Sequence, residues 1–257
     1  MTKDQGDLKS KARSYLAEGW PEKLQQDYVR YKQTRTKRAE KIRTLLHEVG
    51  ALPQADGVLL DVGCSSGLML ELMAKDAKYC VGIELDGSAG LKPHDNIGFA
   101  IADGEDLPFA DSSINVIVCN HIYEHTSNPS KLMDEIWRVL KPGGHCYFAG
   151  PSRWDLIEPH YRLPFLSWLP RPLANGYMRI TGKGHRYMER PLPPKEVALL
   201  LKRFDVSPCI EKIVQDPLKY GSEDLIPPGS LRQTLAIWLA KHIPSLFPGY
   251  VFLCRKP

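Results

Sequence analysis

The amino-acid sequence predicts an α/β fold in which a mostly parallel sheet carries helices on both faces. Strand-like apolar runs alternate with helix-like stretches as far as residue 150. A tight glycine turn, Gly63 to Gly67, follows the first run, and acidic residues close the next two runs at Glu84 and Asp103. Alternation of this kind places parallel strands side by side with helical connections between them.

The predicted elements follow one another in a regular order. A long charged helix covers residues 20–49, and Ile42, Leu45, Leu46 and Val49 lie on it at helical spacing. A second helix, at 128–140, begins beside Pro129 and ends at the Lys-Pro-Gly-Gly run of 141–144. The strand-like runs are residues 58–62, 79–84, 98–102, 115–120 and 145–150, with a further helix at 68–75.

The pattern changes after residue 150. Residues 151–194 are rich in Pro, Arg and aromatic residues and have no clear period. Long segments of this kind in compact domains are usually functional or disordered, so we interpret this one as an insertion after the fifth strand. Periodicity then returns as a helix at 195–203, a strand at 206–214, a helix at 231–243 and a last strand at 250–255.

Charge divides the chain into two predicted parts. Residues 1–50 form a basic helical arm, with 12 Lys and Arg against 7 Asp and Glu, and residues 51–257 form the α/β domain. The whole chain carries only +4, so nucleic acid is not expected as the partner, and the arm is interpreted as a solvated helical face.

Six scattered cysteines, without metal-binding spacing, indicate a reduced compartment and no metal site. With no signal peptide and no membrane-spanning run, the predicted location is the cytoplasm.

The glycine turn has two interpretations. Gly63-x-Ser65-x-Gly67 has the form of a serine hydrolase nucleophile elbow, but no oxyanion-hole segment precedes it and only the charged helix lies upstream. The second interpretation is a turn that approaches a bound cofactor. Glu84, about 20 residues further on, suits the hydroxyls of a ribose, and Asp103 suits the amino group of an adenine. A nicotinamide fingerprint would need a glycine where Leu68 stands, which argues against a dehydrogenase.

Four ordered motifs resemble the class I S-adenosylmethionine-dependent methyltransferases of the small-molecule type. They are LLDVGCSSG, VGIELD, ADGEDLPFADSSINVIVCNHIYEH and the helix that ends in EIWRVLKPGG, over about 90 residues between Val58 and Gly150. The resemblance implies a Rossmann-like sheet of seven strands whose last strand is antiparallel. It also implies S-adenosyl-L-methionine as the cofactor, with the 63–67 loop at its methionine part, Glu84 at the ribose, and Asp103 with Gly104 at the adenine. The complete set of cofactor-binding candidates is Asp61, Gly63, Cys64, Ser65, Gly67, Glu84, Asp103, Gly104 and Asn120.

Candidates for the methyl-acceptor side follow the fourth and fifth strands. After the fourth strand come His121, Tyr123, Glu124 and His125, of which His121 and Tyr123 are the ones expected to line an acceptor pocket. After the fifth strand, His160 is the preferred general base, because an imidazole titrates near neutral pH and Glu158 is close enough to orient it. A structural packing role for these side chains remains the alternative.

The sequence therefore predicts a methyltransferase that acts at oxygen or nitrogen of a small or lipid-linked acceptor. Residues 162–171 combine dense apolar side chains with flanking arginines, so they are expected either to cover the acceptor and contact a membrane surface peripherally or to form a small core of their own. Two alternatives stay open: a cofactor-binding interaction module without turnover, and a methyltransferase of nucleic acid. The second has little support, because Asn120-His121-Ile122-Tyr123 lacks both prolines of the N-P-P-Y motif.

Overall fold

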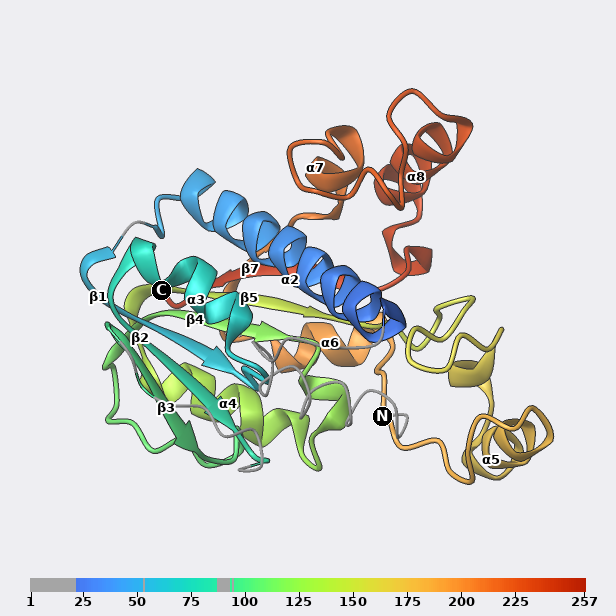
Figure 1. Ribbon diagram of the computed structural model, residues 1–257, viewed down its shortest axis with the longest axis horizontal. Helices are drawn as coiled ribbons and strands as arrows, with labels where there is room; N and C mark the ends of the chain where they lie inside the picture. Colours follow the sequence, from blue (N-terminus) through green and yellow to red (C-terminus); the bar gives the residue numbers. More distant parts are fainter. Residues whose placement is uncertain (1–21, 53, 87–92, 94) are drawn as a thin grey trace.

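The computed structural model describes residues 22–52, 54–86, 93 and 95–257 and contains a seven-stranded sheet (Figure 1). The strands lie in the order β3-β2-β1-β4-β5-β7-β6. Strands β1 to β5 are parallel, whereas β7 runs antiparallel to both of its neighbours, β5 and β6. The predicted fold class is confirmed. The strands are β1 Gln54–Val62, β2 Ala77–Glu84, β3 Ile97–Ile101, β4 Ile114–Asn120, β5 Leu140–Gly150, β6 Asp205–Pro208 and β7 Tyr250–Arg255.

Helices cover both faces of this sheet, as Figure 1 shows. Helices α2 (Glu22–Glu48) and α3 (Leu68–Met73) lie on one face, and α4 (Pro129–Val139) and α6 (Pro194–Leu200) lie on the other. Each face has its own apolar core, because buried strand residues alternate in direction: Leu59 and Val118 belong to the first core and Leu60 and Ile117 to the second. The remaining helices are α5 Arg171–Ile180, α7 Ile210–Gln215 and α8 Leu231–His242.

Helix α2 is an integral part of the domain core over its described side chains. Ala39, Ile42, Leu45 and Leu46 are each no more than 1% exposed and pack in the same cluster as the strands. The guanidinium of Arg43 also pairs with the carboxylate of Asp76, between α3 and β2. The part of the predicted basic arm from Ala39 to Leu46 therefore packs against the domain, and Arg35, Arg38 and Lys41 of the same helix are half-buried. Residues 1–21 of the predicted arm lie outside the described residues.

The prediction of one strand over 206–214 is wrong in its second half. Strand β6 ends at Pro208, and α7 follows from Ile210, with Ile213 and Val214 buried. Pro208 has no N–H to extend the ladder, and a short apolar run does not by itself distinguish a strand from a buried helix.

The insertion contains a helix that the sequence did not predict. Helix α5 begins beside Pro172, and its inner side, Ala174 and Met178, packs with Leu163 and Leu166 in a small separate core. The predicted satellite core of residues 162–171 is therefore present, while Phe165 and Trp168 of the same stretch remain 49% and 38% exposed. Among the described residues, no helix combines the length and the apolar character needed to cross a bilayer.

Candidate functional site

The candidate site lies at the carboxyl ends of β1, β2 and β4. Strand β1 has β2 on one side and β4 on the other, so the order of the strands reverses there. In open α/β sheets this switch point opens a crevice in which ligands bind. Seven of the nine predicted cofactor-binding residues, from Asp61 to Glu84 with Asn120, end or follow β1, β2 and β4, while Asp103 and Gly104 follow β3.

The glycine turn after β1 brings its backbone to this edge. Gly63, Ser65 and Gly67 all have positive φ, at 70°, 53° and 73°. A side chain at position 63 would collide with Ile122, which explains the glycine there. Ser65 occupies a left-handed conformation that is uncommon for a residue other than glycine, so the turn is held by its surroundings.

Contacts of the turn with β2 hold it in place. The backbone N–H of Cys64 donates to Ile83 O at 2.9 Å, and that of Ser65 donates to Glu84 Oε2 at 2.8 Å. The Cys64 sulfur faces β2, and a Cβ atom at Gly82 would lie 2.7 Å from it. Cys64 therefore contributes to the site through its backbone, whereas its side chain packs against the sheet.

Asp61, near the end of β1, is a buried carboxyl group. It is 2% exposed, and its Oδ2 has no hydrogen-bond partner among the described residues. Burial raises the pKa of Asp61 to about 7, against a smaller lowering by Arg35 of α2. A buried carboxyl oxygen without a partner is costly, so a donor supplied by a ligand would offset that cost.

The adenine side of the predicted site follows β3. Asp103 is exposed, and its Oδ1 accepts the backbone N–H of Glu105 at 2.9 Å. A Cβ atom at Gly104 would approach Leu132 of α4 to 2.9 Å, so the chain passes close to that helix. Asn120, half-buried, ends β4 beside the turn. These positions, with the partnerless oxygen of Asp61 and the close-packed glycines, fit the adenosine and methionine parts of S-adenosylmethionine.

A cluster of histidines and carboxylates lies at the next edge, after β4 and β5. The carboxylate of Glu124 is fully buried, and neither of its oxygens has a hydrogen-bond partner among the described residues. His121 Nδ1 lies 3.3 Å from Glu124 Oε1, and His125 Nε2 lies 3.8 Å from it. Burial lowers the pKa of His125. The positive φ of His121, 59°, shows that its backbone is held in a strained conformation beside Glu124.

The insertion supplies the third histidine of this cluster. His160 Nε2 lies 4.0 Å from Glu124 Oε1, and its ring meets that of His125 edge to face, with centroids 5.1 Å apart. His160 Nδ1 contacts Glu158 Oε1 at 2.8 Å, which confirms the predicted pairing of these two residues. Burial lowers the pKa of His160, but the hydrogen bond to Glu158 and the charges of Glu158, Glu189 and Glu124 outweigh it and raise this pKa above its usual value.

Tyr123 differs from its predicted place. It is fully buried, its hydroxyl donates to Pro151 O, and the backbone N–H of Leu192 donates to that hydroxyl at 3.3 Å. Burial also raises the pKa of Tyr123 far above its usual value. The side chain thus joins the end of β5 to the end of the insertion, and we assign it a structural role.

Glu189 is a residue of this region that sequence analysis missed. It is 2% exposed, and its Oε1 accepts the Tyr161 hydroxyl at 3.3 Å. It lies in a stretch without periodicity, more than 60 residues after Glu124 in the chain. Only the folding of the insertion brings the two acidic groups near the same imidazoles, so no local pattern could have identified Glu189.

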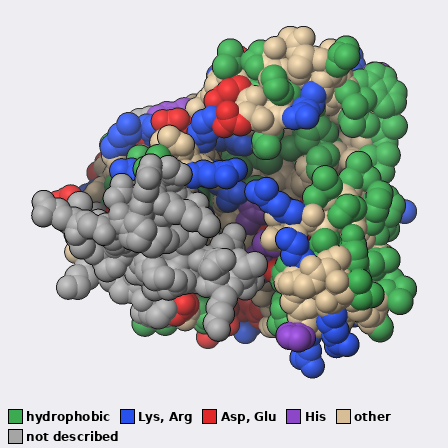
Figure 2. Space-filling model, turned by 45° about the vertical axis from the view of Figure 1, so that its right-hand side comes forward, with side chains coloured by type: hydrophobic (Ala, Val, Ile, Leu, Met, Phe, Trp, Pro, Cys, Tyr) green, Lys and Arg blue, Asp and Glu red, His purple; other side chains and the backbone are tan. Residues whose placement is uncertain are grey.

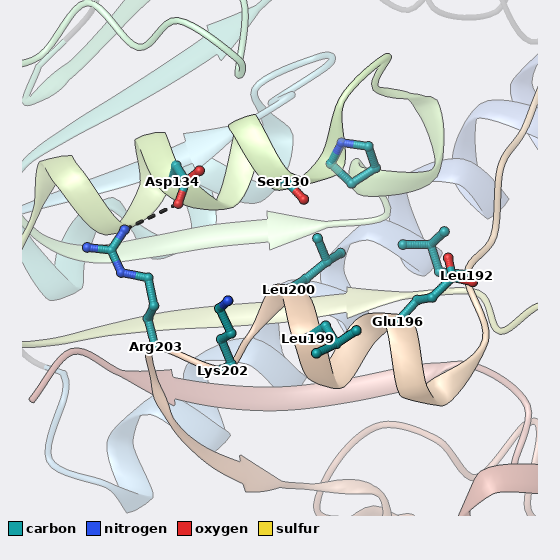
Figure 3. A pocket seen from close by; sticks show the side chains of 9 residues that line it. Ser130, Asp134, Leu192, Glu196, Leu199, Leu200, Lys202 and Arg203 are labelled. Atoms are coloured by element: carbon teal, nitrogen blue, oxygen red, sulfur yellow. Dashed lines mark hydrogen bonds and ion pairs between the residues drawn. The ribbon is translucent and has the colours of Figure 1, made fainter.

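A separate groove of about 580 Å³ lies between α4 and α6 (Figure 3). Its lining includes Leu199, Leu200 and the ion pair of Arg203 with Asp134, at 3.2 Å. It contains none of the predicted cofactor or acceptor residues. We therefore place the site at the strand ends and not in this groove.

The sheet order and the match of residues 60–148 to a family model support a class I S-adenosylmethionine-dependent methyltransferase domain. Residues 60–148 match the family model described as a methyltransferase domain, which confirms the resemblance drawn from the motifs. This match runs from the end of β1 to near the end of β5 and includes all nine predicted cofactor-binding residues.

Named relatives and solved structures agree with this assignment. The chain is 26% identical over 165 residues to a ubiquinone biosynthesis O-methyltransferase of Hahella chejuensis, covering 59% of this chain and 63% of that one. It is 32% identical over 122 residues to a demethylmenaquinone methyltransferase of Tropheryma whipplei, covering 44% and 50%. The chain thus spans between half and two thirds of the length of these relatives.

A solved structure shares the fold. The geranyl diphosphate C-methyltransferase of Streptomyces coelicolor, crystallised with Mg²⁺, geranyl diphosphate and S-adenosyl-L-homocysteine, aligns with a TM-score of 0.50 at 15% identity. The alignment covers 81% of this chain and 75% of that one. At this identity the similarity establishes the fold alone.

Proposed function

We propose that the protein is an S-adenosylmethionine-dependent methyltransferase that modifies oxygen or nitrogen of a small or lipid-linked acceptor. One observation carries the proposal: the glycine turn with Glu84 lies at one side of the switch point, and the histidine cluster around Glu124 follows the adjoining strand. A cofactor site and a group of proton acceptors are thereby neighbours at one edge of the sheet.

Different residues of the cofactor side are proposed to bind different parts of S-adenosylmethionine. Glu84 and Asp103 are the proposed acceptors for the ribose hydroxyls and the adenine amino group, and the 63–67 turn with Asp61 would hold the methionine part. S-adenosylmethionine supplies a methyl group already activated by the positive charge on sulfur. The protein has mainly to align the acceptor and exclude water.

Proton removal from the acceptor is assigned to His160, with His121 as its neighbour. With its Nδ1–H donated to Glu158, the neutral ring presents the Nε2 lone pair toward Glu124 and the cluster. The raised pKa of His160 means that it is a stronger base, and that it loses its proton only at a pH above the usual range. Activity should therefore rise with pH through this titration.

Acceptors of the quinol type are the first to test. One named relative is an O-methyltransferase of ubiquinone biosynthesis and the other is a demethylmenaquinone methyltransferase, so quinone-type acceptors are the natural first candidates. The exposed aromatic rings of Phe165 and Trp168, five residues or more beyond His160, suit such an acceptor and a membrane surface that holds it.

The proposal is tested by methyl transfer from labelled S-adenosylmethionine to a panel of catechols, hydroquinones and amines. Turnover of one acceptor is expected, and His160→Ala should keep cofactor affinity while losing roughly tenfold or more in kcat, the low end for a lost general base. His185→Ala, at an exposed histidine of the same insertion, is the matched control. Cofactor binding without turnover of any acceptor, including cell extracts, would favour the interaction-module alternative.

A further inference from the structure

The Glu124 cluster has an excess of buried acceptors over donors. Glu124, Glu158 and Glu189 are between 0% and 2% exposed, and they lie around the imidazoles of His125 and His160. Both oxygens of Glu124 and Oε2 of Glu189 have no hydrogen-bond partner among the described residues. Buried carboxylates without partners are costly and usually neutralise themselves by binding a proton or a cation.

Distances within the cluster correspond to the edges of a metal coordination shell. From Glu124 Oε1 the nitrogens of His121, His125 and His160 lie at 3.3, 3.8 and 4.0 Å. Two ligand atoms about 2.0–2.2 Å from one tetrahedral ion are roughly 3.3–3.5 Å apart. The ligand atoms of Glu124, His125 and His160 all lie within 4.8 Å of one another, so movements of less than 1–2 Å would place them around one point.

The hydrogen bond of His160 to Glu158 leaves its second ring nitrogen facing the carboxylate of Glu124. Glu158 Oε2 accepts the backbone N–H groups of His160 and Tyr161, at 2.8 and 2.7 Å, so Glu158 is fixed as an acceptor for the Nδ1–H of His160. The Nε2 lone pair of the neutral ring then faces the Glu124 carboxylate, and the two repel each other unless a positive ion or a proton lies between them.

We propose that Glu124, His125 and His160 bind one divalent transition-metal ion, with Zn²⁺ as the best fit. Imidazole and carboxylate ligands favour zinc and its neighbours over Mg²⁺ and Ca²⁺, which prefer oxygen alone. His121 is the nearest further ligand, at 3.3 Å from Glu124. Three protein ligands leave a position for an acceptor oxygen. In the metal-loaded protein the Nε2 lone pair of His160 binds the ion and cannot also take a proton, so the base role of His160 applies only to the metal-free site. The inference rests on the proposed function for the methyl transfer itself.

Glu158 serves in this site as a positioning residue. Carboxylates that accept the second N–H of a metal-bound histidine fix its tautomer and ring orientation, and their loss lowers metal affinity by about 10–100-fold. Glu158, 1% exposed and bound to three N–H groups around His160, matches this arrangement. Glu189, whose charge acts on both His125 and His160, adds to the negative potential.

The test is zinc binding to the full chain after treatment with a chelator, measured by calorimetry and by elemental analysis. One Zn²⁺ per chain with a micromolar or tighter Kd is expected, with Mg²⁺ at least 100-fold weaker. Glu124→Gln, His125→Ala and His160→Ala should each weaken zinc binding at least tenfold, and His185→Ala should leave it unchanged. Glu158→Gln should lower the affinity about 10–100-fold while the melting temperature without metal stays within a few degrees.

A loss of zinc binding can come from a lost ligand or from a misfolded protein, and variants at the partly exposed ligands distinguish the two. Because Glu124 is fully buried, Glu124→Gln can fail to fold, whereas His125 and His160 are 40% and 25% exposed in their side chains. If the far-ultraviolet circular dichroism spectra of His125→Ala and His160→Ala match that of the wild type, their zinc affinities test the proposed ligands directly. Zinc affinity equal in wild type, His125→Ala and His160→Ala would overturn the site, and so would a wild type that binds no zinc.

The same preparations separate this inference from the proposed function. Calorimetry with S-adenosylmethionine on the metal-free protein tests the cofactor side, which contains none of the three ligands. Cofactor binding with methyl transfer but without zinc binding overturns the metal site and leaves the methyltransferase. Zinc binding without cofactor binding overturns the methyltransferase and leaves a metal site of another purpose.

Discussion

At the scale of single residues, the candidate site depends on acidic groups whose surroundings differ. Glu84 accepts backbone N–H groups from Ser65, at 2.8 Å, and from Leu85, at 3.0 Å, so it holds the turn as well as facing the crevice. Asp61 is buried with an oxygen that has no partner among the described residues, and Asp103 is exposed. The three carboxyl groups of this predicted site therefore differ in their surroundings: Glu84 is hydrogen-bonded to the turn, Asp61 is buried, and Asp103 is exposed to solvent.

Glu84→Ala and Asp103→Ala are each expected to weaken S-adenosylmethionine binding by about 1–3 kcal/mol, the range for hydrogen-bond partners left unsatisfied. The larger loss should come from Glu84→Ala, because this change also releases the backbone of Ser65. Calorimetric titration with the cofactor measures both. Asp56→Ala, an exposed carboxylate at the start of β1, is the control, and wild-type affinity in both test variants would contradict the site.

Asp61 should make the stability of the ligand-free protein depend on pH. Its folded pKa of about 7 lies above the usual value of 3.8, so the folded state keeps a proton that the unfolded chain has released. The contribution of this group is therefore complete below about pH 4 and is lost as the pH rises toward 7 and beyond. The stability of Asp61→Asn relative to wild type should increase with pH, by roughly 1–3 kcal/mol between pH 5 and pH 8, because one pKa unit corresponds to about 1.4 kcal/mol. Urea unfolding at the two pH values measures this, and an equal difference at both would refute it.

At the scale of elements, helix α2 closes one face of the domain over the cofactor loop. Its Tyr31 hydroxyl lies 2.9 Å from Ser66 Oγ, and a guanidinium nitrogen of Arg35 lies 3.8 Å from the sulfur of Met69 in α3. The helix thereby contacts both the glycine turn and the helix that follows it.

Leu46→Ala is expected to destabilise the domain by about 2–5 kcal/mol, as large-to-small changes in a packed core do. Leu46 is fully buried in the core on this face of the sheet. Lys32→Ala, at an exposed position of the same helix, should change the free energy of unfolding by less than about 0.5 kcal/mol. Denaturant unfolding compares the two, and a loss below about 1 kcal/mol for Leu46→Ala would mean that α2 contributes little to the packed core.

At the scale of the whole molecule, one side presents a large apolar surface. Figure 2 shows hydrophobic side chains gathered along its right-hand side, over the insertion and the C-terminal helices. On α8, Leu231, Leu235 and Trp238 are 89%, 57% and 50% exposed and lie along one helix face, while Ala236 and Ala240 pack inward. The insertion adds Leu173 and Ile180 of α5, 60% and 87% exposed, with the exposed Arg179 beside Ile180. The guanidinium of Arg171 instead donates to Tyr187 O and Glu189 O. Apolar groups with basic neighbours suit a surface of anionic lipid.

The double variant Leu173→Ser, Ile180→Ser is expected to bind vesicles containing phosphatidylglycerol at least tenfold more weakly than wild type, because each change removes about 2 kcal/mol of apolar contact. Vesicle flotation gives the bound fraction. Leu199→Ser is the matched control, since this equally exposed leucine lies in the groove between α4 and α6. Equal flotation of wild type and double variant would show that this surface does not serve for lipid.

The sequence by itself determined the fold class, the cofactor loop and the strand ends that carry Glu84 and Asp103. These features depend on local patterns, since glycine spacing and the alternation of apolar runs are properties of short stretches of chain. The pairing of His160 with Glu158 was also local, at a separation of two residues.

Only the tertiary structure decided which groups meet across the chain. The burial of α2, the helical ending of the 206–214 run, the inward position of Tyr123 and the grouping of Glu124 with His160 and Glu189 all depend on contacts between distant segments. Hydrophobic periodicity predicts that a residue is buried, but it does not predict which residues of other segments that residue packs against. The insertion has no clear period in its sequence, so its contribution to the site appears only when its own small core folds and brings His160 beside Glu124.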